Sequence, residues 1–131
     1  MIQFDSFMQA EGVPIYQQII RYVKQGIAAG TIRDGEELPS RRVLSALLAV
    51  NPNTVQKAYR QLEDEGLICS HAGAISCVSA GQERAEALRT EMVTACAEAV
   101  VGQMKRMGLS REETVELVGR IWDEAEEGGA S

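Results

Sequence analysis

Hydrophobic side chains recur at helical spacing near the start of the chain. The apolar positions at these intervals are Ile15, Ile19, Tyr22, Val23, Gly26 and Ile27. This period predicts one face of an amphipathic helix over about residues 14–29. Pro14 suits its first turn, and Gly30 suits the position after its last turn. Residues 31–38, which contain the turn signal Asp34-Gly35, are expected to be a short connector that can contribute a minimal strand.

Two shorter helical patterns follow, separated by a tight turn. Ser40 can N-cap the first, which stops near Ala49, and Asn51 with Pro52 can start the second, which runs until Gly66. The inward residues of the first are Leu44, Leu47 and Leu48. Those of the second are Val55, Ala58, Tyr59 and Leu62. Two short helices joined in this way, the second with a polar outer face, are the helix-turn-helix pattern.

A β-hairpin is predicted directly after these helices. Residues 67–70 and 75–78 flank the small-residue turn His71-Ala72-Gly73-Ala74. A hairpin in this position is a wing. Cys69 and Cys77 lie symmetrically about Gly73, so in a simple hairpin they would sit opposite each other. A redox switch on the wing is one hypothesis for this pair, and two small buried thiols are the alternative.

The last third of the chain predicts two more helices. One runs from Gly81 to Gly108, and Ser110 with Glu113 forms an S-x-x-E capping box for the other. Residues 124–131 form an acidic tail that is expected to fray. The expected fold is therefore mainly α with a small β-hairpin. A winged helix-turn-helix domain would span residues 1–80, and a C-terminal α-helical hairpin for dimerisation would span residues 81–131.

The apolar face of this helical hairpin is larger than the hairpin can bury by itself. Pairing with a second copy would cover it, and we expect a homodimer. The residues expected at the dimerisation surface are Leu88, Met92, Cys96, Ala99, Met107, Val118, Ile121 and Trp122. A dimer would place two DNA-reading helices about one DNA turn or more apart, which predicts a pseudo-palindromic operator.

Charge is distributed unevenly along the 131 residues. The net charge of −6 argues against a nucleic-acid binder at first sight. Residues 14–80, however, carry seven Lys/Arg against six Asp/Glu, whereas residues 81–131 carry six against eleven. The acidity therefore belongs mainly to the C-terminal third, and the region with the helix-turn-helix pattern is nearly neutral.

Several classes of protein are excluded or disfavoured. No apolar run approaches the roughly 18 residues of a membrane span, and the N-terminus lacks a signal-peptide pattern, so a cytoplasmic protein without a membrane partner is expected. The three cysteines do not have the spacing of a disulfide framework or a zinc module. His71 is the only histidine, and no catalytic set can be built around it. We therefore expect no enzyme, metal or cofactor.

Four ungapped segments in the first half of the chain resemble the N-terminal domain of GntR-family regulators. They are P-I-Y-Q-Q-I (Pro14 to Ile19), G-x-x-L-P-S-x-R-x-L (Gly35 to Leu44), V-N-P-N-T-V-Q-K-A-Y (Val50 to Tyr59) and L-E-x-E-G-L-I (Leu62 to Ile68). The short two-helix remainder resembles the YtrA-like branch of this family. The resemblance implies a DNA-binding transcription regulator, and we expect steric repression of promoters.

The start of the second helix carries the candidate DNA contacts. Small and amide side chains there can reach base edges in the major groove, and helix N–H groups can meet phosphate. This set is Asn51, Asn53, Thr54, Gln56 and Lys57. By resemblance to the family, Arg42 contacts base or phosphate and Ser40 offers donors to a phosphate. Arg41 and Arg60 either add electrostatic contacts or are solvated surface residues.

Three further residues bear on the packing of the helices and the turn between them. Tyr16 either lies near the DNA backbone or is partly buried, whereas Tyr59 is expected in the core. Ala49 stands where many relatives have a turn glycine, and a positive φ there would cost about 1 kcal/mol or more.

The wing departs from the family pattern, because residues 71–75 contain no arginine and only Gly73 matches. It should contribute backbone contact at most. The main alternative is a winged-helix protein-interaction module that has lost DNA binding. A small-molecule effector is a possible further partner, but the sequence does not identify one or show a pocket for it.

Overall fold

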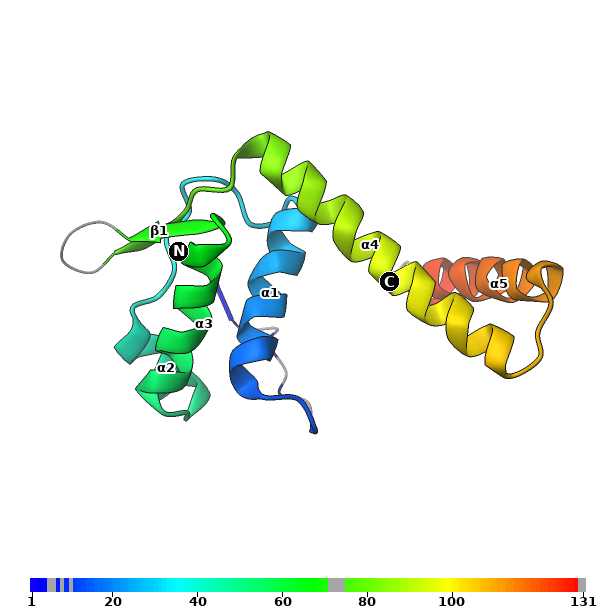
Figure 1. Ribbon diagram of the computed structural model, residues 1–131, viewed down its shortest axis with the longest axis horizontal. Helices are drawn as coiled ribbons and strands as arrows, with labels where there is room; N and C mark the ends of the chain where they lie inside the picture. The colour runs from blue at the N-terminus through cyan, green and yellow to red at the C-terminus, as the bar shows by residue number, and fades with distance from the viewer. Residues whose placement is uncertain (5–6, 8, 10, 71–74, 130–131) are drawn as a thin grey trace. The chain divides into compact units, whose positions relative to one another are not determined.

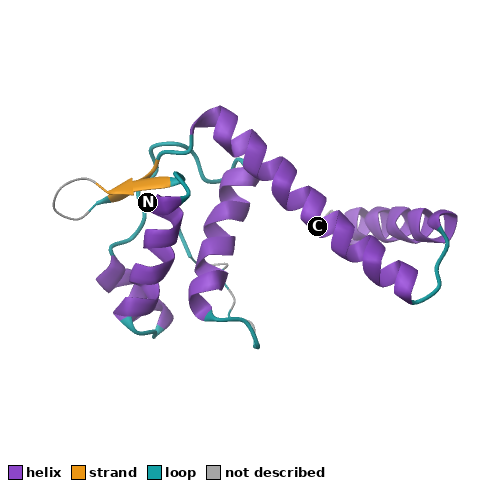
Figure 2. Cartoon of the chain, viewed as in Figure 1, coloured by secondary structure: helices purple, strands orange, loops and turns teal. Residues whose placement is uncertain are grey.

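The computed structural model describes residues 1–4, 7, 9, 11–70 and 75–129. Its elements are α1 (Ile15–Ala29), α2 (Arg41–Leu48), α3 (Pro52–Asp64), β1 (Ile68–Ser70), β2 (Ser76–Val78), α4 (Gly81–Arg106) and α5 (Arg111–Gly129). Figure 2 shows a mainly helical chain with one small hairpin, which confirms the predicted fold class. The chain divides into two compact units, residues 1–92 and 93–131, which are described separately below.

The helix starts follow the predicted capping chemistry. The Oγ of Ser40 accepts a hydrogen bond from the backbone N–H of Val43 at 3.1 Å, and α2 begins at the next residue. The Oδ1 of Asn51 accepts from the N–H of Asn53 at 2.8 Å, with Pro52 in the first turn of α3. Both side chains satisfy backbone donors that a helix leaves unpaired at its N-terminus. The predicted starts of α2 and α3 are confirmed.

Helix α3 is the centre of the N-terminal unit. It packs against α1, α2 and β1, as Figure 1 shows. Its buried face is the predicted one, and Tyr59 is fully buried as expected. The fully buried large side chains of this core are Ile19, Val23, Leu44, Val55, Tyr59, Leu62, Leu67 and Leu88. One continuous apolar core therefore fixes the two short helices of the helix-turn-helix.

The first residues of the chain also enter this core, which the sequence pattern did not predict. Ile2 and Phe4 are each 4% exposed. The backbone N–H of Ile2 donates to the carbonyl of Glu37 at 2.7 Å, and the ring of Phe4 stacks on that of Tyr22 with centroids 4.8 Å apart. Two isolated apolar residues carry no period, so sequence reasoning assigned them no element.

The wing sheet has the predicted antiparallel pairing. Cys69 lies opposite Cys77, and this part of the hairpin prediction is confirmed. The connector adds an isolated bridge between Glu37 and Cys77, which is the predicted minimal strand. The turn His71-Ala72-Gly73-Ala74 lies outside the described residues, so the prediction for Gly73 stays a prediction.

The C-terminal unit differs in burial. The capping box that starts α5 is confirmed, because the N–H of Glu113 donates to the Oγ of Ser110 at 3.1 Å and the N–H of Ser110 donates back to the Glu113 carboxylate at 3.0 Å. Hydrogen bonds from the backbone and side chain of Ser110 lower the pKa of the Glu113 carboxyl. None of the side chains described in residues 93–128 is buried. The predicted boundary after residue 80 stays a prediction; the compact units divide after Met92, within α4.

None of the helices in the described part of the chain combines the length and the apolar character needed to cross a membrane.

Candidate nucleic-acid interface

The outer face of α3 is polar and exposed. Val55, Ala58, Tyr59 and Leu62 face the core, so the remaining positions face outward. The exposed side chains of the predicted DNA-contacting set on this helix are Asn53, Gln56, Lys57 and Arg60, and Thr54 is half-buried. Asn53 and Thr54 lie in the first turn, where the unpaired backbone N–H groups and the positive end of the helix dipole also lie, and the others follow along the helix. This end of α3 therefore offers amide groups and positive charge on one surface.

Asn51 and Ser40 cap helices, in addition to any contact that they make with DNA. The Oδ1 of Asn51 is engaged by the N–H of Asn53, which leaves its amide N–H groups to donate elsewhere. The Oγ of Ser40 is engaged by the N–H of Val43, so its hydroxyl hydrogen remains as a donor. Bidentate pairing with adenine requires both the oxygen and the nitrogen of an amide. Within this set, Asn53 and Gln56 are better placed for such pairing than Asn51.

A strained residue forms the turn between α2 and α3. Ala49 has φ 56° and ψ 47°, the left-handed conformation that its position in the sequence suggested. The backbone N–H of Val50 then donates to the carbonyl of Ser45 at 3.0 Å, which closes the end of α2. A left-handed conformation costs a non-glycine residue about 1–2 kcal/mol. The surrounding core must offset this cost, since the turn sets the angle between the two helices.

Tyr59 fixes the entry to α2 against α3. Its buried hydroxyl donates to the carbonyl of Pro39 at 2.7 Å. Burial of the ring raises the pKa of Tyr59 strongly, and the positive charge of Arg41 opposes this only in part. The hydroxyl therefore stays protonated and acts as a donor at all ordinary pH values. This bond holds the segment that leads into Ser40 on the surface of α3.

Arg41 and Arg42 are neighbours with different surroundings. The Nη2 of Arg41 lies 3.2 Å from the Oε1 of Glu63, and its guanidinium lies over the ring of Tyr59 at 5.2 Å from the centroid. Arg42 is exposed, and no ion pair to it is found among the described residues. Arg41 is thus held against its own domain, whereas Arg42 is available to a phosphate or a base.

The ion pair of Arg41 is part of a polar chain that reaches the wing. The Oε1 of Glu63 also accepts a hydrogen bond from the hydroxyl of Ser70 at 2.6 Å. The Oγ of Ser70 lies 2.9 Å from that of Ser76, which is buried on the neighbouring strand. The start of α2, the last turn of α3 and both wing strands are therefore linked through one carboxylate. From the sequence, Arg41 is a candidate DNA contact or a solvated surface residue; this link is not visible there because its members are far apart in sequence.

Lys57 is positioned by the first helix. Its Nζ lies 3.9 Å from the centroid of the Tyr16 ring, within the range of a cation–π interaction. Tyr16 is half-buried at the start of α1, and its hydroxyl accepts a hydrogen bond from Gln17 at 3.1 Å. The aromatic face holds the ammonium group at the exposed surface of α3. Tyr16 thus bears on the candidate interface by supporting a lysine.

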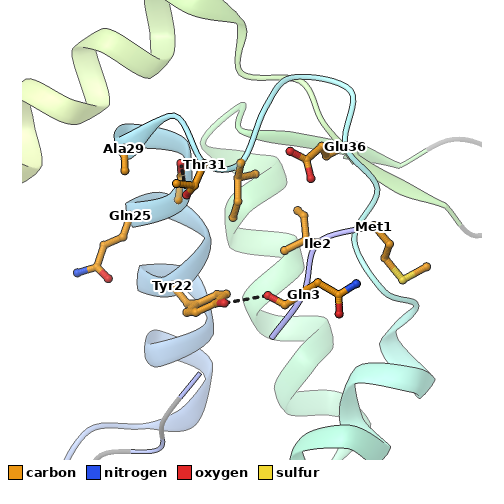
Figure 3. Close-up of a pocket in the computed structure, with 10 residues that line it drawn as sticks. Met1, Ile2, Gln3, Tyr22, Gln25, Ala29, Thr31 and Glu36 are labelled. Atoms are coloured by element: carbon orange, nitrogen blue, oxygen red, sulfur yellow. Dashed lines mark hydrogen bonds between the residues drawn. The ribbon is translucent and has the colours of Figure 1, made fainter. Parts of the chain in front are cut away.

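A cavity of about 540 Å³ lies elsewhere in the N-terminal unit. Figure 3 shows it between the first residues of the chain, α1 and the connector that follows α1. The hydroxyl of Tyr22 donates to the carbonyl of Gln3 at 2.8 Å on its wall, and Glu36 supplies a carboxylate. Its lining includes neither the outer face of α3 nor a basic side chain, so it does not extend the candidate interface. The prediction of a small-molecule effector stays a prediction.

The predicted dimerisation residues fall into two groups. Leu88 is 2% exposed and belongs to the core of the N-terminal unit, and Met92 packs against that core. The others are exposed, and they are Cys96, Ala99, Met107, Val118, Ile121 and Trp122. Trp122 and Met107 are both 66% exposed, more than Val118 and Ile121.

Together, a helix-turn-helix with a polar outer face and a two-stranded wing define a regulator of the winged helix-turn-helix class. The model of the family described as "Bacterial regulatory proteins, gntR family" matches residues 15–74. This range contains α1, α2, α3 and β1. The chain belongs to the GntR family, which is a family of transcription regulators.

Individual relatives agree with this assignment. The transcriptional repressor YtrA of Bacillus subtilis is 46% identical over 68 residues, which are 52% of this chain and 50% of YtrA. The HTH-type transcriptional regulator YhcF of the same organism is 31% identical over 103 residues, 79% of this chain and 85% of YhcF. A GntR family transcriptional regulator from Listeria monocytogenes has a similar structure, with a TM-score of 0.79, 30% identity and coverage of 86% of this chain and 98% of that one. The chain spans half the length of YtrA but most of the other two.

Proposed function

We propose that this regulator binds double-stranded operator DNA with the start of α3 in the major groove and Arg42 beside it. The observation that carries the proposal is the surface formed by Asn53, Gln56, Lys57 and Arg60. These side chains are exposed on one face of a helix whose other face is fixed in the core. A rigid helix with this surface is what major-groove reading requires.

Each group has a role that fits its chemistry. Asn53 and Gln56 would pair with adenine edges, since each has an amide oxygen and an amide nitrogen available. Lys57 and Arg42 would contact phosphate or guanine. Ser40 would donate its hydroxyl to a phosphate. Arg60 would add a weaker electrostatic contact, and the wing would supply backbone contact near Gly73 at most.

The proposed assembly is a homodimer formed by the C-terminal unit. Its surface consists of the six exposed residues named above, from Cys96 to Trp122. No side chain described in this unit is buried within a single copy, and a second copy would supply the missing cover. Two copies related by a two-fold axis would read a pseudo-palindromic operator, and repression would follow from occupation of a promoter.

Binding-site selection from random duplexes, followed by fluorescence anisotropy, tests the DNA-contacting surface. We expect Arg42→Ala and Lys57→Ala each to cost about 1–3 kcal/mol of binding free energy if the group pairs with a base. If the group contacts a phosphate, the slope of log affinity against log salt should fall by about 1 instead.

Arg89→Ala is the matched control. Arg89 is an exposed arginine of the same unit, on α4, which begins at the opposite end of that unit from the α2–α3 turn (Figure 1). Its loss should leave affinity and salt slope unchanged. Equal affinities for wild type, Arg42→Ala and Lys57→Ala would show that the DNA site lies elsewhere. If selection enriches no duplex, the DNA-binding proposal itself fails.

A further inference from the structure

Two of the three cysteines form a cross-strand pair at the base of the wing. Cys69 on β1 and Cys77 on β2 are directly opposite residues in the antiparallel register. Side chains of directly opposite residues project from the same face of a sheet. Both are half-buried, and all three cysteines of the chain are thiols in the structure. The third, Cys96, is exposed on α4 in the C-terminal unit.

The hydrogen bonding of the sheet defines the spacing of this pair. The backbone N–H of Val78 donates to the carbonyl of Glu36, so this edge of β2 faces the connector. The N–H and C=O of Cys77 therefore point the other way, toward Cys69. Opposite residues that exchange backbone hydrogen bonds have Cα atoms about 5.5 Å apart. Disulfides span Cα distances of about 4.4–6.8 Å, so the Cα spacing of this pair is suitable. Opposite residues have Cβ atoms about 4.5–5.5 Å apart and a disulfide needs about 3.5–4.5 Å, so a bond between the two sulfurs requires a small approach of the two strands.

We propose that Cys69 and Cys77 are a redox-active pair that forms a reversible intramolecular disulfide on reaction with a peroxide. The thiolate of one cysteine attacks a peroxide oxygen, and the O–O bond breaks to give a sulfenic acid and hydroxide. The thiolate of the other then attacks this sulfur, the S–S bond forms, and a second hydroxide leaves. Both sulfurs are oxidised, the peroxide is reduced to water, and a thiol reductant reverses the reaction.

The product would tie the two wing strands together next to the polar chain from Arg41. Ser70 and Ser76, the next opposite pair of the hairpin, belong to that chain. The pair is therefore a modification site within the DNA-binding unit. The proposal concerns thiol chemistry and does not depend on the proposed DNA contacts.

Thiol titration and peptide mass spectrometry on the full chain test the proposal. The protein is treated with a small excess of hydrogen peroxide and denatured; thiols are titrated in one portion, and a second portion is alkylated for peptide mass spectrometry. We expect titratable thiols to fall from three to one, with loss of two hydrogen atoms and one disulfide-linked peptide pair that contains Cys69 and Cys77. Dithiothreitol should restore all three thiols.

Two variants separate the pair from the remaining cysteine. Cys96→Ser should go from two titratable thiols to none and still give the linked peptides. Cys77→Ser should give no intramolecular link, and its Cys69 should be trapped as a sulfenic acid by dimedone. The proposal is overturned if the wild type keeps three thiols, if Cys69 and Cys77 go to sulfinic acids without a link, or if the only disulfide formed joins two chains through Cys96. Peptide mapping of the wild type keeps the test valid even if a variant folds poorly.

Discussion

Both units of this chain contain helices with apolar side chains at helical spacing, but only one of them buries these side chains within its own residues. In residues 1–92, α1, α2 and α3 direct their apolar stripes into one core, where eight large side chains are almost fully shielded from solvent. In residues 93–128, no apolar side chain of α4 or α5 is fully buried, and Trp122 is 66% exposed. Apolar side chains on helices therefore form a buried core in the first unit and an exposed surface in the second.

This difference separates two sources of stability. The N-terminal unit has the packed interior that normally supports independent folding. The C-terminal unit has well-capped helices, but capping contributes only about 1 kcal/mol per helix end. Most helical stability comes from tertiary packing, so this unit depends on a surface outside its own residues. The proposed second copy would provide that surface.

A core truncation should give the largest effect. Leu62→Ala removes a fully buried side chain of α3, and we expect it to lower the free energy of unfolding by about 2–5 kcal/mol. Leu47→Ala is the matched control. Leu47 was expected to face inward, but it is 62% exposed because the short helix α2 buries only the face that carries Leu44 and Ser45. Its truncation should change the free energy of unfolding by less than about 0.5 kcal/mol. Urea denaturation at fixed protein concentration measures both. Similar losses for the two variants would contradict the division between core and surface.

An exposed aromatic residue should matter for assembly. Trp122→Asp places a charge in the proposed dimer surface and should weaken self-association by about 2 kcal/mol or more. Asp123→Asn changes an exposed neighbour on α5 and should leave association unchanged. Sedimentation equilibrium over a range of protein concentrations distinguishes the two. If the wild-type protein stays monomeric at micromolar concentration, a second copy does not cover the exposed apolar side chains of the C-terminal unit, and the dimer proposal fails.

The N-terminal unit is well packed, but its turn is not conformationally ideal. Ala49→Gly relieves the left-handed alanine between α2 and α3, and we expect a gain of about 1 kcal/mol in unfolding free energy. Ala46→Gly, at an exposed position inside α2, should instead lose about 0.5–1 kcal/mol. In thermal or urea denaturation, the change in the free energy of unfolding should therefore have opposite signs for the two substitutions, although they lie only three residues apart. Losses at both positions would mean that the turn is not strained in solution.

The ion pair between Lys24 of α1 and Glu65, the residue that follows α3, should give the smallest effect. Partial burial alone would raise the pKa of the Glu65 carboxyl, but hydrogen bonds from Lys24 and Gln61 and nearby positive charge lower it overall. A carboxyl whose pKa is lower in the folded state stabilises the fold at pH values above its ordinary pKa. This contribution is lost as the pH falls from the ordinary pKa through the lower pKa of the folded state.

Glu65→Gln should therefore cost less than about 1 kcal/mol at neutral pH and almost nothing in acid, because the pair is partly exposed. Urea midpoints at the two pH values test this, with the exposed Asp64→Asn as control. If Glu65→Gln costs more stability in acid than at neutral pH, the pKa of Glu65 is not lowered by folding.

Local signals in the sequence predicted most of the fold. The caps of Ser40, Asn51 and Ser110 depend on residues within three positions, and each is seen as predicted. The pairing of Cys69 with Cys77 follows from the symmetry of a short hairpin in the same way. Periodicity also identified the buried face of α3, because one helix face recurs at fixed intervals.

Features that join distant residues could not be predicted from local pattern. Ile2 and Phe4 complete the core without any period of their own. Leu88 follows the apolar stripe of α4 but is buried in the N-terminal core, because a continuous helix can serve two environments along its length. Arg41 is a surface charge by its sequence position, and only the fold brings Glu63 and Ser70 to it. The side chains of the candidate site can therefore be identified from the sequence, but the contacts that hold them in place cannot.

The cap at the start of α3 limits how much sequence information each amide can carry. The oxygen of Asn51 is turned toward the N–H of Asn53, so this side chain presents chiefly its amide donors to DNA. Acceptors for these donors occur on adenine, guanine and thymine edges alike. A position of the operator that met Asn51 alone would tolerate several bases. Positions that meet Asn53 or Gln56 would be close to invariant, so a selected operator should show strict and permissive positions side by side within each half-site.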